Sequence, residues 1–263
     1  MTPRVARWAE LRAPDFRSLP ANSVAILPLG AVEQHGPHLP LSVEYDLVEA
    51  VIDRALPLVR GVTVLVLPTL RITKSDEHMR HPGTLALSAA TLLAVLRDVG
   101  RSVARAGVTW LVLFNGHGGN TALLQVAARD LRISHDLLVA SCSWSRFAET
   151  DGLFAPAEYA RDLHAGASET SAMLAARPDL VDMGAAPAPD SVLPDWHARQ
   201  RFLGLTGDAA APAWIIDDLS QTGVVGDATD ANAERGARLL SSAARNFAAF
   251  LAEFRDFDHR SPA

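Results

Sequence analysis

The stretch VTWLVLFNGHGGNTALLQVAARDL, residues 108–131, carries the clearest signal of the architecture. Its first seven residues, Val108–Phe114, are β-branched, aromatic or leucine throughout, which predicts a strand buried on both faces. The segment Asn120–Leu131 then carries apolar residues at helical spacing and predicts a long helix. A Gly-rich turn, Asn115–Gly119, joins the two. A buried strand that runs through a short turn into a helix is typical of a parallel α/β sheet.

The same succession of strand and helix continues on both sides of this stretch. Short apolar runs predict three further buried strands, at Val24–Leu29, Val62–Leu67 and Leu137–Ser143. Helical spacing predicts further helices at Leu47–Leu56, Leu92–Val103, Ala167–Ala176 and Ala231–Phe254. Strands separated by helices of this length predict an α/β fold in three layers, with a mainly parallel sheet flanked by helices on both faces.

Local signals mark the ends of elements and the loops between them. Ser88 is the expected N-cap of the helix that follows it, and Gly107 is expected to end that helix. Phe147–Asp162 is expected to form an active-site loop or a short helical lid. Pro178–Trp214, rich in Pro, Ala and Asp, is expected to wrap the surface. The sequence shows no internal repeat or linker, so we predict a single domain over residues 1–263.

Composition narrows the class of function. The 263 residues are 49% hydrophobic and 21% charged, with a net charge of −6. Basic residues are scattered arginines apart from Lys74, so we expect no nucleic-acid partner. Cys142 is the single cysteine, so no internal disulfide can form. We see no signal peptide and no apolar run near the roughly 20 residues that span a bilayer, so we expect no membrane association and a cytoplasmic location.

Histidines, carboxylates and glycines gather in five segments, several of them directly after predicted strands. In open parallel sheets, ligands bind outside the carboxyl ends of the strands. The five segments are Gly30–His38, Ser42–Asp46, Asp76–Thr84, Phe114–Asn120 and Asp162–Ser171. Their side chains are therefore candidates for one shared site.

The first two segments offer metal ligands. Glu33 and His35 stand two apart, so in an extended loop their side chains point the same way and could reach one metal or a close pair of metals. The alternative is a polar surface turn. Glu44 and Asp46 are also two apart, and a carboxylate can bridge two cations that lie roughly 3.5–4 Å apart. The alternative for this pair is the solvated start of a helix.

The other three segments add histidines and a Gly-rich turn. His78, near a Pro-Gly turn, could line a pocket or lie in a surface loop. His117 sits among glycines that allow a close approach to a ligand. Phosphate binding is the rival interpretation of this turn, but the pattern matches no phosphate-binding fingerprint and favours a metal. His164 precedes a predicted helix and Glu169 lies in its first turns, where helix capping is the alternative role.

The five segments together predict a metal site. Mixed imidazole and carboxylate ligands suit Zn²⁺, Mn²⁺, Ni²⁺ or Co²⁺. The lack of thiolate ligands argues against a structural zinc site.

Five motifs resemble the creatininase family of metal-dependent amidohydrolases. They are LPLGAVEQHGPHLPL (27–41), EHMRHPGT (77–84), FNGHGGN (114–120), HAGASETS (164–171) and TGVVGD (222–227). They follow one another in family order, and the resemblance spans roughly residues 24–240. It implies an α/β fold with a mainly parallel sheet, a homo-oligomer such as a hexamer, and two divalent metal ions, zinc or manganese among them.

The resemblance also implies a ligand set. By position in the motifs, Glu33 and His117 correspond to ligands of one metal, and His35 and Glu169 correspond to ligands of the other. The bridging aspartate of the family falls on Glu44, whose side chain is one methylene longer.

Two further positions complete this set. Asp46 is the competing bridge, although the loop would have to shift for it to align. His164 corresponds to the catalytic histidine of the family.

Departures from creatininase itself indicate another substrate. Creatininase carries an aromatic residue and a glutamate just after the metal-binding histidine, where this chain has Gly118 and Gly119. Tryptophan is also lacking just before His164. We therefore expect a substrate other than creatinine, because a glycine-lined wall leaves room for a larger or differently shaped molecule.

These residues predict a metal-dependent amidohydrolase that cleaves a C–N bond of a small amide, cyclic amide or formamide with a metal-activated water. His164 would act as general acid, His78 would orient the substrate, and the N–H groups of Gly118 and Gly119 would stabilise the oxyanion. Three alternatives stay open: a metallopeptidase that trims a short peptide, a non-catalytic metal- or metabolite-binding protein, and an anion-binding module.

Overall fold

A five-stranded sheet runs through the centre of the computed structural model, which describes residues 5–205 and 209–257. Its strands lie in the order β1-β3-β2-β4-β5, and every neighbouring pair is parallel. The strands are β1 Val5–Arg7, β2 Val24–Leu29, β3 Val64–Val66, β4 Trp110–Asn115 and β5 Leu138–Ser143. The predicted parallel sheet is confirmed.

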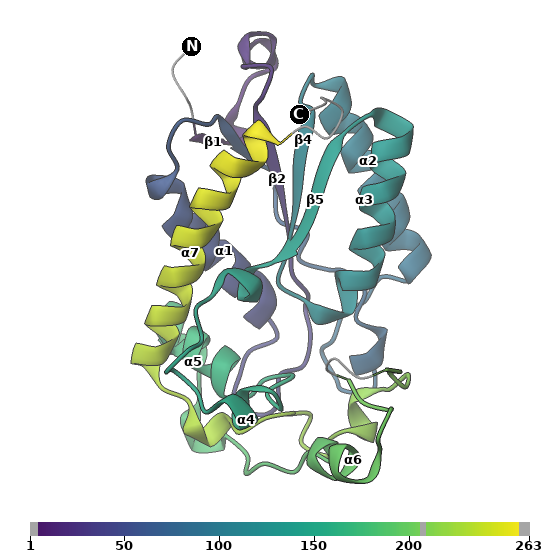
Figure 1. Ribbon diagram of the computed structural model, residues 1–263, viewed down its shortest axis with the longest axis vertical. Helices are drawn as coiled ribbons and strands as arrows, with labels where there is room; N and C mark the ends of the chain where they lie inside the picture. Colours follow the sequence, from purple (N-terminus) through teal and green to yellow (C-terminus); the bar gives the residue numbers. More distant parts are fainter. Residues whose placement is uncertain (1–4, 206–208, 258–263) are drawn as a thin grey trace.

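Helices cover both faces of the sheet and complete the three layers (Figure 1). One face carries α1 Val43–Ala55, α5 Ala167–Ala176 and α7 Ala233–Asp256. The other carries α2 Ala89–Arg105 and α3 Thr121–His135. Two short helices lie in the loops at the bottom of Figure 1, α4 Pro156–Tyr159 and α6 Leu193–Arg199. None of the helices in the described residues has both the length and the apolar character to cross a membrane.

Strand β4 shows why the sheet needs both helical layers. Successive side chains of a strand point to opposite faces. Val112 and Phe114 pack in the cluster that contains α1 and α7, whereas Leu111 and Leu113 pack in the cluster that contains α2 and α3. All four are fully buried. Phe114 also stacks on Phe247 of α7 with ring centroids 3.9 Å apart.

Most predicted strands and helices are present, but the sequence analysis did not predict strand β1 or helix α6. Ser88 caps α2 as expected, because its hydroxyl accepts a hydrogen bond from the backbone N–H of Thr91 at 3.2 Å. Strand β1 has three residues and no recognisable periodicity, and it forms where Val5 finds a partner in Val64 at the sheet edge. Helix α6 lies inside the segment expected to be a surface wrap, since seven residues are too short for a clear helical pattern.

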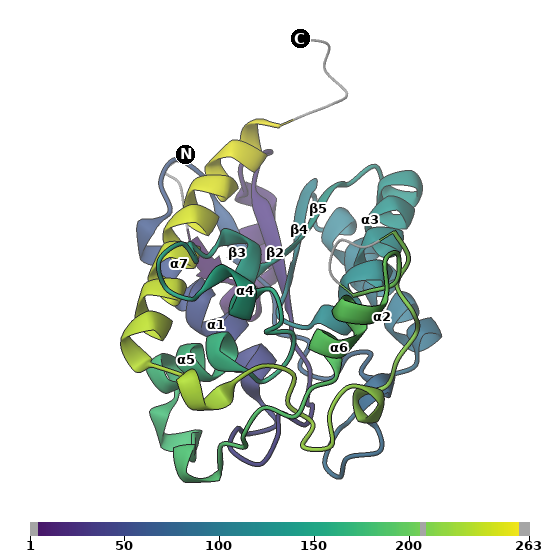
Figure 2. The same cartoon turned by 60° about the horizontal axis from the view of Figure 1, so that its bottom comes forward.

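The strand order places the loops of β2 and β4 together. Strand β3 lies on one side of β2, and the next strand in the chain, β4, lies on the other side. The topological switch point of the sheet is therefore between β2 and β4. Leu29 is level with Asn115, and Asn115 is level with Ser143. The loops after these strands therefore open at one edge, which Figure 2 brings forward.

Candidate metal centre

Glu33 and His35 enter the site from the loop after β2. Both side chains are fully buried. Nδ1 of His35 lies 2.9 Å from the backbone carbonyl of Glu33, and because a carbonyl can only accept, this nitrogen carries the proton. Nε2 of His35 is left with a free lone pair and has no hydrogen-bond partner. The backbone thus fixes the tautomer that a metal ligand requires.

His117 is held the same way in the loop after β4. Its Nε2–H donates to the backbone carbonyl of Lys74 at 2.7 Å. The lone pair on Nδ1 therefore faces Glu44 Oε1 at 2.8 Å and Glu33 Oε2 at 3.3 Å. Oε2 of Glu33 also accepts a hydrogen bond from the hydroxyl of Ser75.

Glu44 faces this cluster and Asp46 does not. Helix α1 begins at Val43, so the two carboxylates lie in its first turn, and residues two apart on a helix do not share a face. Asp46 accepts a hydrogen bond from Ser42 at 2.6 Å and lies 3.7 Å from Nη1 of Arg177. Glu44 is brought to His117 because the backbone of α1 crosses Gly116 so closely that any Cβ there would overlap it.

Helix α5 and the residues just before it bring Glu169 and His164 to the cluster. Oε2 of Glu169 lies 3.8 Å from Nε2 of His35 and also accepts a hydrogen bond from the N–H of Ala165 at 2.7 Å. Nε2–H of His164 donates to the backbone carbonyl of Gln34 at 2.9 Å, so its Nδ1 lone pair faces Glu33 Oε1 at 3.5 Å. Ala165 has φ of 56°, a left-handed conformation that costs a non-glycine residue roughly 1–3 kcal/mol and is concentrated at functional sites.

Three overlapping sets of these side chains have ligand atoms within 4.8 Å of one another. They are Glu33 with His35 and Glu44, His35 with His164 and Glu169, and Glu33 with His78 and His164. Among the buried polar atoms that find no partner in the described residues are Glu33 Oε1, His35 Nε2 and Glu44 Oε2. Because unpartnered buried polar atoms are costly, these atoms fit a bound divalent ion.

The electrostatics of the cluster also fit a cation. Burial raises the pKa of Glu33 well above its usual range, and the charge of Glu44 adds to the effect. Burial also raises the pKa of Glu44, with the charge of Glu169 adding to it. Burial lowers the pKa of His35 to about 3, and burial with the charge of His35 lowers the pKa of His164 to about 3. A bound cation would stabilise these carboxylates and neutral imidazoles together.

A small cavity adjoins the cluster. It has a volume of about 180 Å³, and its lining includes Gly118, Ser143, Trp144, Tyr159, His164 and Glu169. The predicted acid and one predicted ligand therefore border it directly. Gly118 lines this cavity, whereas Gly119 lies against Glu77 and His117.

His78 and Gln34 form a polar layer beside Glu33. Nε2 of His78 lies 3.3 Å from Glu33 Oε1, and the Gln34 amide N–H donates to Nδ1 of His78 at 2.9 Å and to the carbonyl of Gly223 at 3.0 Å. His78 thus reaches the cluster, but it is not among the residues that line the cavity. Sequence reasoning missed Gln34, although its place between Glu33 and His35 was an available signal.

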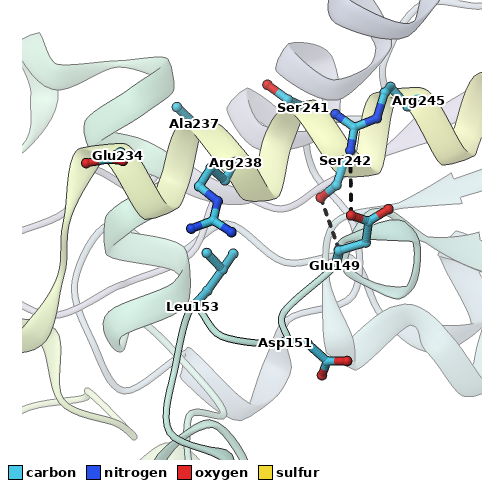
Figure 3. Close-up of a pocket in the computed structure, with 9 residues that line it drawn as sticks. All are labelled: Glu149, Asp151, Leu153, Glu234, Ala237, Arg238, Ser241, Ser242 and Arg245. Atoms are coloured by element: carbon cyan, nitrogen blue, oxygen red, sulfur yellow. Dashed lines mark hydrogen bonds and ion pairs between the residues drawn. The ribbon is translucent and has the colours of Figure 1, made fainter.

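A wider hollow of about 400 Å³ lies between α7 and the loop after β5 (Figure 3). There the N–H of Glu149 donates to Ser242 at 3.0 Å, and Arg245 lies 3.6 Å from the Glu149 carboxylate. Neither a histidine nor any predicted site residue lines it. These contacts attach the loop to α7, whereas the candidate metal ligands lie at the edge of the sheet.

Comparisons with known proteins agree with this geometry. Residues 9–251 match the family described as "Creatininase: Creatinine amidohydrolase". The parallel sheet, with its buried cluster of carboxylates and imidazoles at the carboxyl edge, defines the class as metal-dependent hydrolases. The chain belongs to the creatininase family.

The names of individual relatives describe two different activities. The chain is 32% identical over 256 residues to the mycofactocin precursor peptide peptidase of Mycobacterium ulcerans (strain Agy99), covering 90% of this chain and 88% of that protein. It is 35% identical over 192 residues to the creatinine amidohydrolase of Pseudomonas putida, covering 67% of this chain and 72% of that protein.

Solved structures of creatininase share the fold. The structure of a mutant creatininase complexed with creatine has a TM-score of 0.73 and 29% identity, with 95% of this chain and 99% of that chain covered. The structure described as "Creatininase Mn" has a TM-score of 0.72 and 28% identity, with coverage of 94% and 97%.

Proposed function

We propose that this protein hydrolyses a C–N bond in a small amide, cyclic amide or formamide by means of a metal-activated water. The observation that carries the proposal is the cavity of about 180 Å³ that shares His164 and Glu169 with the cluster. Its volume lies below the roughly 300–1,000 Å³ of pockets that hold drug-sized ligands, which favours a small substrate.

The proposed ligand assignment is the one that the family resemblance implies, and the lone pairs and carboxylates described above support it. Glu33 and His117 would hold one ion, His35 and Glu169 the other, and Glu44 would lie between them. Two divalent ions, zinc or manganese, would polarise the substrate carbonyl and lower the pKa of a water to about 7. The Mn and Zn–Zn descriptions of creatininase structures support this choice of metals.

His164 is the proposed proton carrier. The Gln34 carbonyl holds its Nε2–H, which leaves Nδ1 turned toward the cluster. From this position Nδ1 can take the proton of the attacking water and pass it to the leaving nitrogen. The same geometry would suit a metal ligand, so metal content after substitution of His164 separates the two roles.

The remaining residues act on the substrate. Gly118 borders the cavity, and its N–H is the proposed oxyanion donor together with the N–H of Gly119. His78 lies beside Glu33 and is proposed to orient the substrate through the layer it forms with Gln34.

A metallopeptidase is the second candidate. The names of relatives that cover about nine tenths of this chain favour it, since they are peptidases of a precursor peptide. Such an enzyme would need the cavity to accept the end of a peptide.

A substrate panel on metal-loaded protein tests the proposal, with His164→Ala as the matched control. The panel contains creatinine, other cyclic amides, formamides and short peptides. Turnover of a small amide that disappears with chelator and in His164→Ala supports the proposal, and turnover of peptides alone favours the peptidase. Stoichiometric metal without any turnover would favour a non-catalytic binding protein.

A further inference from the structure

The two glycines after His117 have different surroundings. An added Cβ at Gly118 would meet no atom within 4 Å. An added Cβ at Gly119 would overlap Oε1 of Glu77 and Nε2 of His117. Position 119 therefore has no room for a side chain, because the ring of His117 and the carboxylate of Glu77 both occupy that space.

Glu77 comes from the short turn Asp76–His78 and is nearly buried, with its side chain 10% exposed. Its Oε1 lies 3.8 Å from Nε2 of His117. Its other oxygen forms an ion pair with Lys74, the one lysine of the sequence. The backbone carbonyl of Lys74 accepts the Nε2–H of His117 at 2.7 Å. Residues 74 and 77 thus act on the same edge of the same ring.

This edge is the one opposite the metal-facing nitrogen. A cation bound to Nδ1 of His117 would withdraw electrons from the ring and would make its Nε2–H more positive. A carboxylate and a carbonyl beside that N–H stabilise it and hold the ring in place, as partners of metal-binding histidines commonly do. The ion pair with Lys74 keeps the Glu77 carboxylate pointed at the ring.

We propose that Glu77 is a positioning residue of the metal centre, which holds the ring of His117 from a different loop. The inference rests on the proposed metal site and assigns a role to a residue outside the expected ligand set. The glycine at position 119 leaves room for both Glu77 and the ring of His117.

The test removes the charge and keeps the shape. Zn²⁺ and Mn²⁺ affinities of the parent, Glu77→Gln and the exposed neighbour Asp76→Asn are measured by competition with a chromogenic chelator. We expect Glu77→Gln to bind metal about 10–100-fold more weakly, the usual loss for an outer partner of a metal-binding histidine, and Asp76→Asn to bind like the parent. Melting temperatures of the metal-free proteins show that each variant is folded.

The outcomes separate this inference from the proposed function. Parent protein that binds metal, together with unchanged affinity in Glu77→Gln, overturns the role of Glu77 alone. Parent protein that binds neither ion overturns the metal site and this inference together.

Discussion

Replacing Glu44 by glutamine should have opposite effects on the stability of the metal-free and the metal-bound protein. In the metal-free protein, Glu44 is buried near Glu33 and one of its oxygens has no partner. A neutral amide of the same shape removes this unfavourable charge. We therefore expect the melting temperature of metal-free Glu44→Gln to equal or exceed that of the parent.

With metal bound, the same substitution should be destabilising. Loss of an outer partner costs about 10–100-fold in metal affinity, so loss of a direct ligand should cost at least about 100-fold. At a metal concentration of about 100 times Kd, binding stabilises the parent by ~2.7 kcal/mol and such a variant by ~0.4 kcal/mol. The difference of ~2.3 kcal/mol corresponds to a loss of about 5–9 °C in the metal-induced rise of the melting temperature.

Asp46→Asn is the matched control. It weakens a contact with Ser42 and removes a charge in the first turn of α1, worth ~0.3–1 kcal/mol, and the effect should be the same with and without metal. Thermal melts and elemental analysis of metal per chain provide the assay. A Glu44→Gln protein that keeps two ions and the full metal-induced rise would refute the placement of Glu44. An ion lost from Asp46→Asn would refute it equally.

Three other substitutions and one labelling experiment test the site and the fold. His164→Ala should keep its metal by elemental analysis and lose about 10²–10⁴-fold in turnover, and a lost ion would make His164 a ligand instead. Gly236→Ala should lower stability to urea by ~1–3 kcal/mol, because its Cβ would overlap the carbonyl of Ser171 where α7 crosses α5; unchanged stability would contradict this packing. Phe247→Ala should cost ~3–5 kcal/mol in the same urea assay, since the ring is fully buried, and a loss below about 1 kcal/mol would be inconsistent with its stacking. Burial raises the pKa of Cys142 to about 12, so a thiol reagent at a pH of about 8 should label the folded protein on the order of 10³ slower than the unfolded chain, with the rate increasing as pH rises toward that pKa. Equal rates would contradict the burial of the thiol.

The layers of the fold and the edge that holds the site could be predicted from the sequence. Runs such as Val108–Phe114 are apolar on both faces, and such a strand is stable only when both faces are covered. Because parallel strands end at one edge, the histidines and carboxylates that follow β2 and β4 had to meet there. These conclusions depend on local patterns, which a sequence records directly.

Which side chains reach the cluster depends on tertiary packing. The choice between Glu44 and Asp46 depends on where α1 begins and on its close approach to Gly116, because each residue of a helix turns its side chain by about 100°. Glu44 and His117 are 73 positions apart in the chain and 2.8 Å apart in space. Likewise, the sequence shows that position 119 is glycine, but only the tertiary structure shows that Glu77 and the ring of His117 fill the space beside it. Contacts of this kind join segments that carry no pattern in common, so they exist only once the sheet and helices have packed.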